Sequence, residues 1–109
     1  MITERMVEQA LRYLTDPQQE GSKARAAAEH MDDLTKTVLA KLMLQSEEKS
    51  AAAKEMEARA HPTFEAHLDQ VKACREVDYM WRNRFSASNA IIEAWRTEQS
   101  NIRAAEKVR

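Results

Sequence analysis

The sequence predicts an all-α protein, an elongated antiparallel helical hairpin or coiled coil with one very long C-terminal helix. Gly occurs once and Pro twice in 109 residues, whereas an average chain of this length holds roughly seven and five. Ala, Glu, Lys, Arg, Gln and Met, which favour helices, are abundant. Charged residues make up 32% and aromatic residues only 6%. This composition predicts that the apolar stripe of each helix is narrow relative to its solvated surface, which is typical of long paired helices.

The first helix is predicted over residues 3–15, with Thr3 as its N-cap. Its apolar residues recur on one helical face: Met6, Val7, Ala10, Leu11 and Leu14. Thr15-Asp16-Pro17 ends this helix, and Asp16 can cap a second helix over residues 17–45. Gly21-Ser22 offers an alternative start for that second helix.

A short third helix is predicted over residues 50–60, because Ser50 can cap an Ala-rich run and His61-Pro62 ends it. The last helix is predicted over residues 62–107, which contain no Gly or Pro after Pro62. An apolar seam with steps of three and four residues follows it, as in a coiled coil: Phe64, Leu68, Val71, Cys74, Val77, Trp81, Phe85, Ser88, Ile92, Trp95, Gln99 and Ile102.

The length bounds the chain to a single helical domain over residues 1–109. A helix of about 45 residues is roughly 65–70 Å long and needs partner helices along its length. We expect the second helix to fold back along it, and we expect the protein to be a homo-oligomer. The first helix packs either on its own chain or on a neighbour.

Charge is distributed unevenly along the chain. Residues 1–71 hold 9 Lys/Arg and 13 Asp/Glu, a balance of −4, whereas residues 72–109 hold 8 and 5, a balance of +3. The basic C-terminal third is compatible with nucleic-acid binding. The lone Cys74, the lack of a long apolar run and an N-terminus unlike a signal peptide predict a cytoplasmic protein without membrane contact.

The residue patterns of metal and catalytic sites are missing. His30, His61 and His67 form no recognised zinc-binding spacing. Cys74 falls on the apolar seam, and no serine stands in a Gly-rich elbow. We therefore expect no enzyme activity, no metal and no cofactor.

The segment from Tyr79 to Arg109 carries four of the six aromatic residues, interleaved with arginines. The oligomer seam is predicted to include Val77, Trp81, Phe85, Ser88, Ile92, Trp95 and Ile102. A surface for nucleic acid or another partner is predicted at Tyr79, Arg82, Arg84, Arg96, Arg103, Lys107 and Arg109. These arginines either flank the seam and pair with acidic residues, or hold a nucleic-acid backbone beside an exposed aromatic ring.

The segment from Glu57 to Val108 resembles small uncharacterised helical proteins of tailed bacteriophages and prophages. The similarity rests on Ala60-His61-Pro62, on the spacing of Phe64, His67 and Leu68, and on the segment from Ile91 to Gln99. Such proteins belong to early gene blocks beside single-strand annealing or recombination functions. The resemblance implies a role near phage DNA recombination or replication and, for a phage-encoded protein, a location in the host cell cytoplasm.

These observations predict a non-enzymatic, oligomeric accessory protein of phage DNA recombination or replication. It would bind single-stranded DNA, a recombinase or both through the basic side of its last helix. One alternative is an inhibitor of a host nuclease or defence complex that acts by protein contact alone, which the acidic residues 1–71 favour. The other is a purely structural coiled-coil element.

Overall fold

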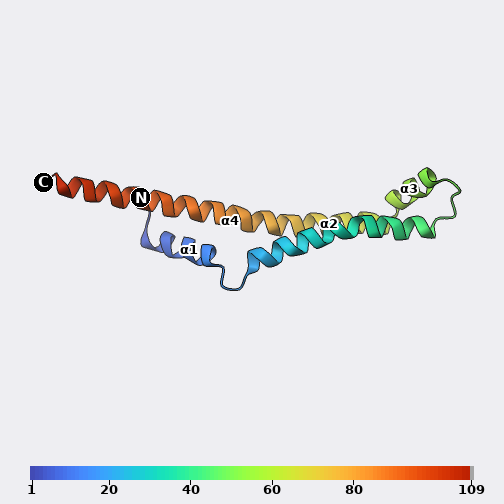
Figure 1. Ribbon diagram of the computed structural model, residues 1–109, viewed down its shortest axis with the longest axis horizontal. Coiled ribbons are helices and arrows are strands. Elements are labelled where there is room, and N and C mark those ends of the chain that lie inside the picture. Colours follow the sequence, from blue (N-terminus) through green and yellow to red (C-terminus); the bar gives the residue numbers. More distant parts are fainter. Residues whose placement is uncertain (109) are drawn as a thin grey trace. The chain divides into compact units, whose positions relative to one another are not determined.

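The computed structural model describes residues 1–108 and contains four helices, α1 (Glu4–Thr15), α2 (Glu20–Gln45), α3 (Ala51–Ala60) and α4 (Pro62–Lys107) (Figure 1). The predicted all-α fold with a long C-terminal helix is confirmed. Residues 1–21 and those from Tyr79 onward form one compact unit, which we call the terminal unit. Residues 22–78 form the second, which we call the hairpin unit.

The helix ends follow local capping chemistry. Thr3 and Ser50 are the N-caps of α1 and α3, where Thr3 Oγ1 accepts from Met6 N and Ser50 Oγ accepts from Ala53 N. The extended backbone of His61, which precedes Pro62, ends α3. These ends agree with the predicted ones to within a residue.

The second helix begins at Glu20, three residues later than predicted. Asp16 and Gln19 both have positive φ, so residues 17–19 form a turn rather than the first turn of α2. Asp16 nevertheless caps the helix, since its two carboxylate oxygens accept from Glu20 N and Gly21 N, each at 2.9 Å.

In the hairpin unit, α2 and the first part of α4 pack antiparallel. Leu42 near the end of α2 packs with Phe64 at the start of α4, and Ala58 of α3 completes this core cluster. Farther along, Asp32 of α2 pairs with Arg75 of α4. The buried residues in the first part of α2, Ala24 and Ala28, are small, so a neighbouring helix can approach closely there.

The inward-facing residues of α4 alternate strictly between steps of three and four. They are Phe64, His67, Val71, Cys74, Asp78, Trp81, Phe85, Ser88, Ile92 and Trp95, all buried or half-buried. Within this chain, four of the twelve predicted seam residues are exposed: Leu68 and Val77, at 45% and 46%, and Gln99 and Ile102. In place of Leu68 and Val77, the polar His67 and Asp78 face inward. A regular seven-residue repeat decides which residues face inward, and it overrides their polarity here.

Candidate functional site

The terminal unit pairs α1 with α4, and α1 packs on its own chain. The backbone N–H of Ile2 donates to both carboxylate oxygens of Glu98 at 3.1 and 3.2 Å. At the other end of α1, the Tyr13 ring meets the Trp81 ring edge-on with centroids 6.2 Å apart. The two helices are therefore antiparallel, and Ala10 is the buried contact of α1.

Arg84 lies in a cluster of aromatic rings within the chain. Its guanidinium carbon is 5.1 Å from the centroids of both the Tyr13 and the Trp81 rings, a geometry typical of cation–π contacts. Phe85 continues the cluster, at 6.1 Å from Trp81. Arg84 was predicted to bind a partner as part of an exposed surface, but it is half-buried on α1 and lies on another side of α4 from Arg82, Arg96 and Arg103.

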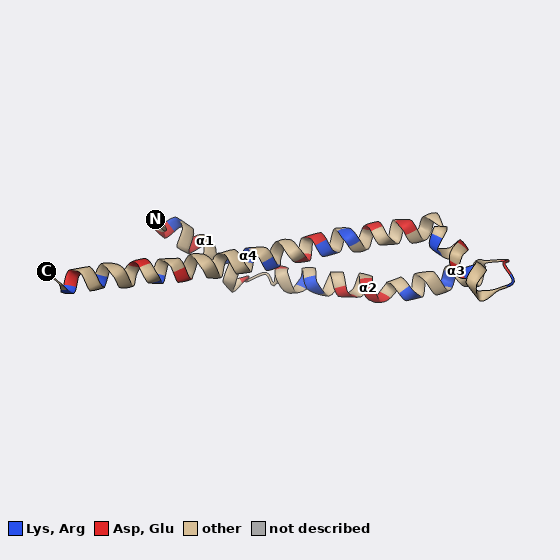
Figure 2. Cartoon of the chain, turned by 90° about the horizontal axis from the view of Figure 1, so that it is seen from above, with Lys and Arg blue, Asp and Glu red and all other residues tan. Residues whose placement is uncertain are grey.

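The remaining basic residues share one exposed side of α4. This side consists of the residues that directly follow the seam residues, and we call it the basic flank: Tyr79, Arg82, Ser86, Asn89, Glu93, Arg96, Ser100, Arg103 and Lys107. Every one of these residues is exposed. The flank holds four basic residues and one acidic residue, whereas Figure 2 shows charges of both signs along α4 as a whole.

Within the basic flank, Arg96 forms an ion pair with Glu93 at 3.3 Å, and both side chains are about 70% exposed. Such a solvent-exposed pair contributes roughly 0–1 kcal/mol to stability, so Arg96 can release Glu93 and bind another anion at little cost. Arg103 and Lys107 form no ion pair with any of residues 1–108. Tyr79 is 52% exposed and lies three residues before Arg82, so it adds an accessible ring to the basic flank.

A shallow hollow of about 280 Å³ lies at the edge of the flank and is lined by Trp95, Arg96, Gln99 and Arg103. An indole ring next to two guanidinium groups offers both a stacking surface and hydrogen-bond donors for an anion. Residues 99–108, which include two of the residues that line the hollow, are all exposed. Ile102, predicted on the seam, is 45% exposed.

The other predicted seam residues face the interior of the terminal unit to different degrees. Ser88 is buried, and Trp81, Phe85, Ile92 and Trp95 are half-buried. Arg109, predicted to extend the basic surface, lies outside the described residues.

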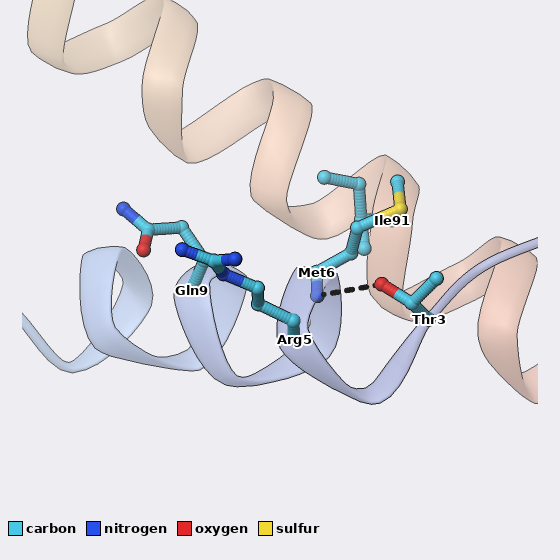
Figure 3. A pocket seen from close by; sticks show the side chains of 5 residues that line it. All are labelled: Thr3, Arg5, Met6, Gln9 and Ile91. Carbon is cyan, nitrogen blue, oxygen red and sulfur yellow. Dashed lines mark hydrogen bonds between the residues drawn. The ribbon is translucent and has the colours of Figure 1, made fainter.

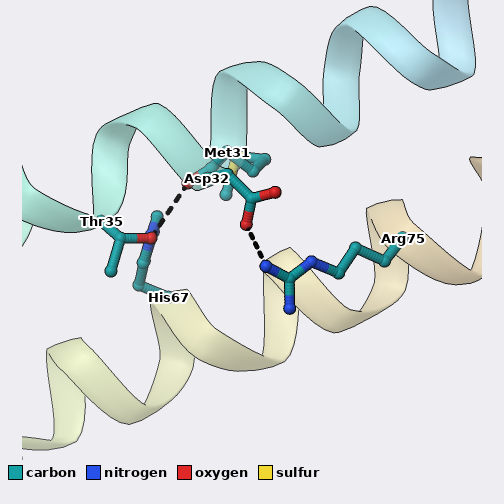
Figure 4. Close-up of polar contacts among 5 residues, drawn as sticks. All are labelled: Met31, Asp32, Thr35, His67 and Arg75. Atoms are coloured by element: carbon teal, nitrogen blue, oxygen red, sulfur yellow. Dashed lines mark hydrogen bonds and ion pairs between the residues drawn. The ribbon is translucent and has the colours of Figure 1, made fainter.

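The hairpin unit contains a polar cluster that sequence reasoning did not find (Figure 4). His67 Nε2 lies 2.9 Å from Thr35 Oγ1, whose hydroxyl donates to the Met31 carbonyl at 3.2 Å. Arg75 donates to Asp32 at 2.5 Å. The seven-residue spacing of α4 could have predicted that His67 faces inward, because His67 lies seven residues before Cys74, which is on the seam. These side chains hold two helices together, and in residues 1–108 no group of three or more His, Cys, Asp or Glu could bind a metal ion.

No family model matches this chain, and no curated protein and no solved structure matches it either. Among the described helices, none is long and apolar enough to span a lipid bilayer.

Proposed function

We propose that the protein is a non-enzymatic helical accessory factor that binds single-stranded DNA through the basic flank of α4. One observation carries the proposal: nine consecutive flank positions are all exposed and include four basic residues, one acidic residue and one accessible tyrosine ring. Exposed Arg and Lys side chains neutralise phosphates, and an accessible ring stacks on a base. The resemblance to phage proteins of recombination gene blocks favours the same function, in phage DNA recombination or replication.

The spacing of the basic residues fits an extended strand. Arg82, Arg96 and Arg103 recur at multiples of seven residues, so the last two are about 10.5 Å apart along the helix axis. The hollow beside Trp95 lies at the arginine-rich end of the flank. Binding of this kind needs no glycine-rich loop and shows little sequence preference, because phosphates and ring faces occur in every sequence.

Fluorescence anisotropy with a labelled single-stranded oligonucleotide tests the proposal. We expect binding at low salt whose logarithmic affinity falls with a slope of about −0.7 for each phosphate contacted. The variant R96E/R103E should lose most of this affinity. The control R25E/R59E makes the same change in net charge at exposed arginines of the hairpin unit, each of which, like Arg96, pairs with a glutamate on its own helix, and it should bind like the original protein. The proposal is wrong if no binding occurs at low salt, or if both variants lose affinity equally.

A second candidate is a function through protein contact alone, with a recombinase or a host nuclease as the target. It is favoured by two large apolar side chains on the hairpin unit, Leu44 at 85% and Met56 at 74% exposure. The hairpin unit also holds more acidic than basic residues. The double variant L44S/M56S should then abolish partner binding and leave the oligonucleotide titration unchanged.

A further inference from the structure

The side of α4 opposite the basic flank carries three apolar residues between Arg84 and Glu98, and Met80 precedes them. It consists of the residues that directly precede the seam residues, and we call it the apolar flank: Met80, Arg84, Ala87, Ile91, Ala94 and Glu98. In the terminal unit a groove between α1 and α4 opens on this flank, lined by Thr3, Arg5, Met6, Gln9 and Ile91. Figure 3 shows the Met6 and Ile91 side chains next to each other there, with Arg5 and Gln9 beside them.

We propose that this groove binds a second copy of the chain, with the two α4 helices antiparallel and the twofold axis at Ile91. Arg84 lies seven residues before Ile91 and Glu98 lies seven residues after it. In an antiparallel pair centred on Ile91, Arg84 of each copy therefore faces Glu98 of the other, about 10.5 Å from the axis. The same geometry places Ala87 within one residue, about 1.5 Å along the axis, of Ala94 of the other copy, where two small side chains let the helix backbones approach closely.

Charge selects the antiparallel arrangement. A parallel pair in the same register places Arg84 against Arg84 and Glu98 against Glu98, which is repulsive on both sides. The two charged side chains are held in position in each chain. Arg84 stacks on Tyr13 and Trp81, which leaves N–H groups at the edge of its guanidinium, and Glu98 accepts from Ile2 N and retains further lone pairs.

Burial points to a second copy as well. No large side chain among the described residues is fully buried, and Met6, Met80 and Leu11 of the terminal unit are each about 40–50% exposed. An isologous dimer covers the apolar flank and leaves the basic flank accessible, so it is independent of the proposed function.

Disulfide cross-linking tests both the surface and the direction. In a C74A background, which removes the single cysteine, we prepare the single-cysteine variants A87C and A94C with tags of different size. Under mild oxidation the mixture should form a disulfide between A87C and A94C, and each variant alone should cross-link at least tenfold more slowly. I91C lies on the axis and should cross-link with itself. N89C, an exposed position on the basic flank, is the matched control and should not.

Light scattering tests whether Arg84 and Glu98 stabilise the dimer. The protein should be a dimer at high micromolar concentration, and E98R should weaken the dimer at least tenfold because two arginines then face each other. R84E/E98R should recover part of the loss. A monomer at high micromolar concentration overturns the proposal, and so does preferential self-linking of A87C and A94C, which indicates parallel helices. If N89C cross-links as fast as the variants of the apolar flank, the disulfides form without this interface, and the proposal is wrong.

Discussion

The two units of this protein use the same helix, α4, and the same seven-residue spacing, but they bury different side chains. In the hairpin unit, Leu42 and Phe64 form a core with Ala58, and Val38, Leu39 and Met43 pack against it. In the terminal unit the fully enclosed residues are small, namely Ala10, Gly21 and Ser88, and the aromatic residues at the interface remain half-exposed.

The difference arises because three helices converge on Phe64, whereas the terminal unit has only α1 and the beginning of α2 to cover α4. A periodic seam thus specifies which residues face a partner, and the number of partner helices decides how far each is buried.

The largest expected effect is the loss of the hairpin core. Phe64→Ala removes a side chain that is only 4% exposed, and it should lower the free energy of unfolding by about 3 kcal/mol because a cavity remains. Urea denaturation followed by circular dichroism measures this. Leu68→Ala, four residues away at an exposed position, should cost under about 1 kcal/mol. Similar losses for both variants would contradict the assigned seam.

The terminal unit is most sensitive at Gly21. A Cβ at this position would lie 2.7 Å from Phe85 Cε2 and 3.2 Å from Asp16 Oδ2, so the Phe85 ring and its neighbours must shift. Gly21→Ala should destabilise the unit by about 1–2 kcal/mol even after the gain in helix propensity. Both tryptophans, Trp81 and Trp95, belong to this unit, so their fluorescence reports its unfolding. The double variant with Phe85→Leu should recover part of the loss, and strict additivity of the two changes would contradict the close contact.

A smaller effect is expected at the polar seam position of the hairpin unit. Thr35→Val keeps the side-chain shape but removes the partner of His67 Nε2, which is 7% exposed. The cost should be about 1–2 kcal/mol, because a buried donor is left without an acceptor. Thr37→Val, at an exposed position of the same helix, is the control for β-branching and hydroxyl loss. Equal stabilities of the two variants would show that the hydrogen bond contributes nothing.

The smallest effect is expected at the ion pair between Asp32 and Arg75. Their side chains are 42% and 49% exposed, so Asp32→Asn should cost only about 0.2–1 kcal/mol, and moderate salt should remove most of this difference. The neighbouring Asp33→Asn is the control. Unfolding midpoints in low and moderate salt measure the effect, and a salt-independent loss above this range would mean that Asp32 has another structural role.

Much of the helical architecture was predictable because its causes are local. Thr3 and Ser50 cap helices within three residues of themselves, and His61-Pro62 ends one through a steric clash with the neighbouring residue. The candidate site was predictable in part. Arg96, Arg103 and Tyr79 are exposed, and their binding of a partner stays a prediction. The contact of Arg84 within the chain depends on Tyr13, a residue 71 positions away in the sequence.

The sequence by itself determined the helical class, the breaks between helices and the seven-residue spacing of α4, because backbone propensity and capping act over a few residues. Only the tertiary structure decided which residues at that spacing face inward. Leu68 and Val77 are more apolar than His67 and Asp78, but a helix that packs against another presents residues by their angular position. Tertiary contacts also separated Arg84, which stacks within the chain, from the exposed Arg96 and Arg103. That separation depends on where α1 lies along α4, which no local pattern specifies.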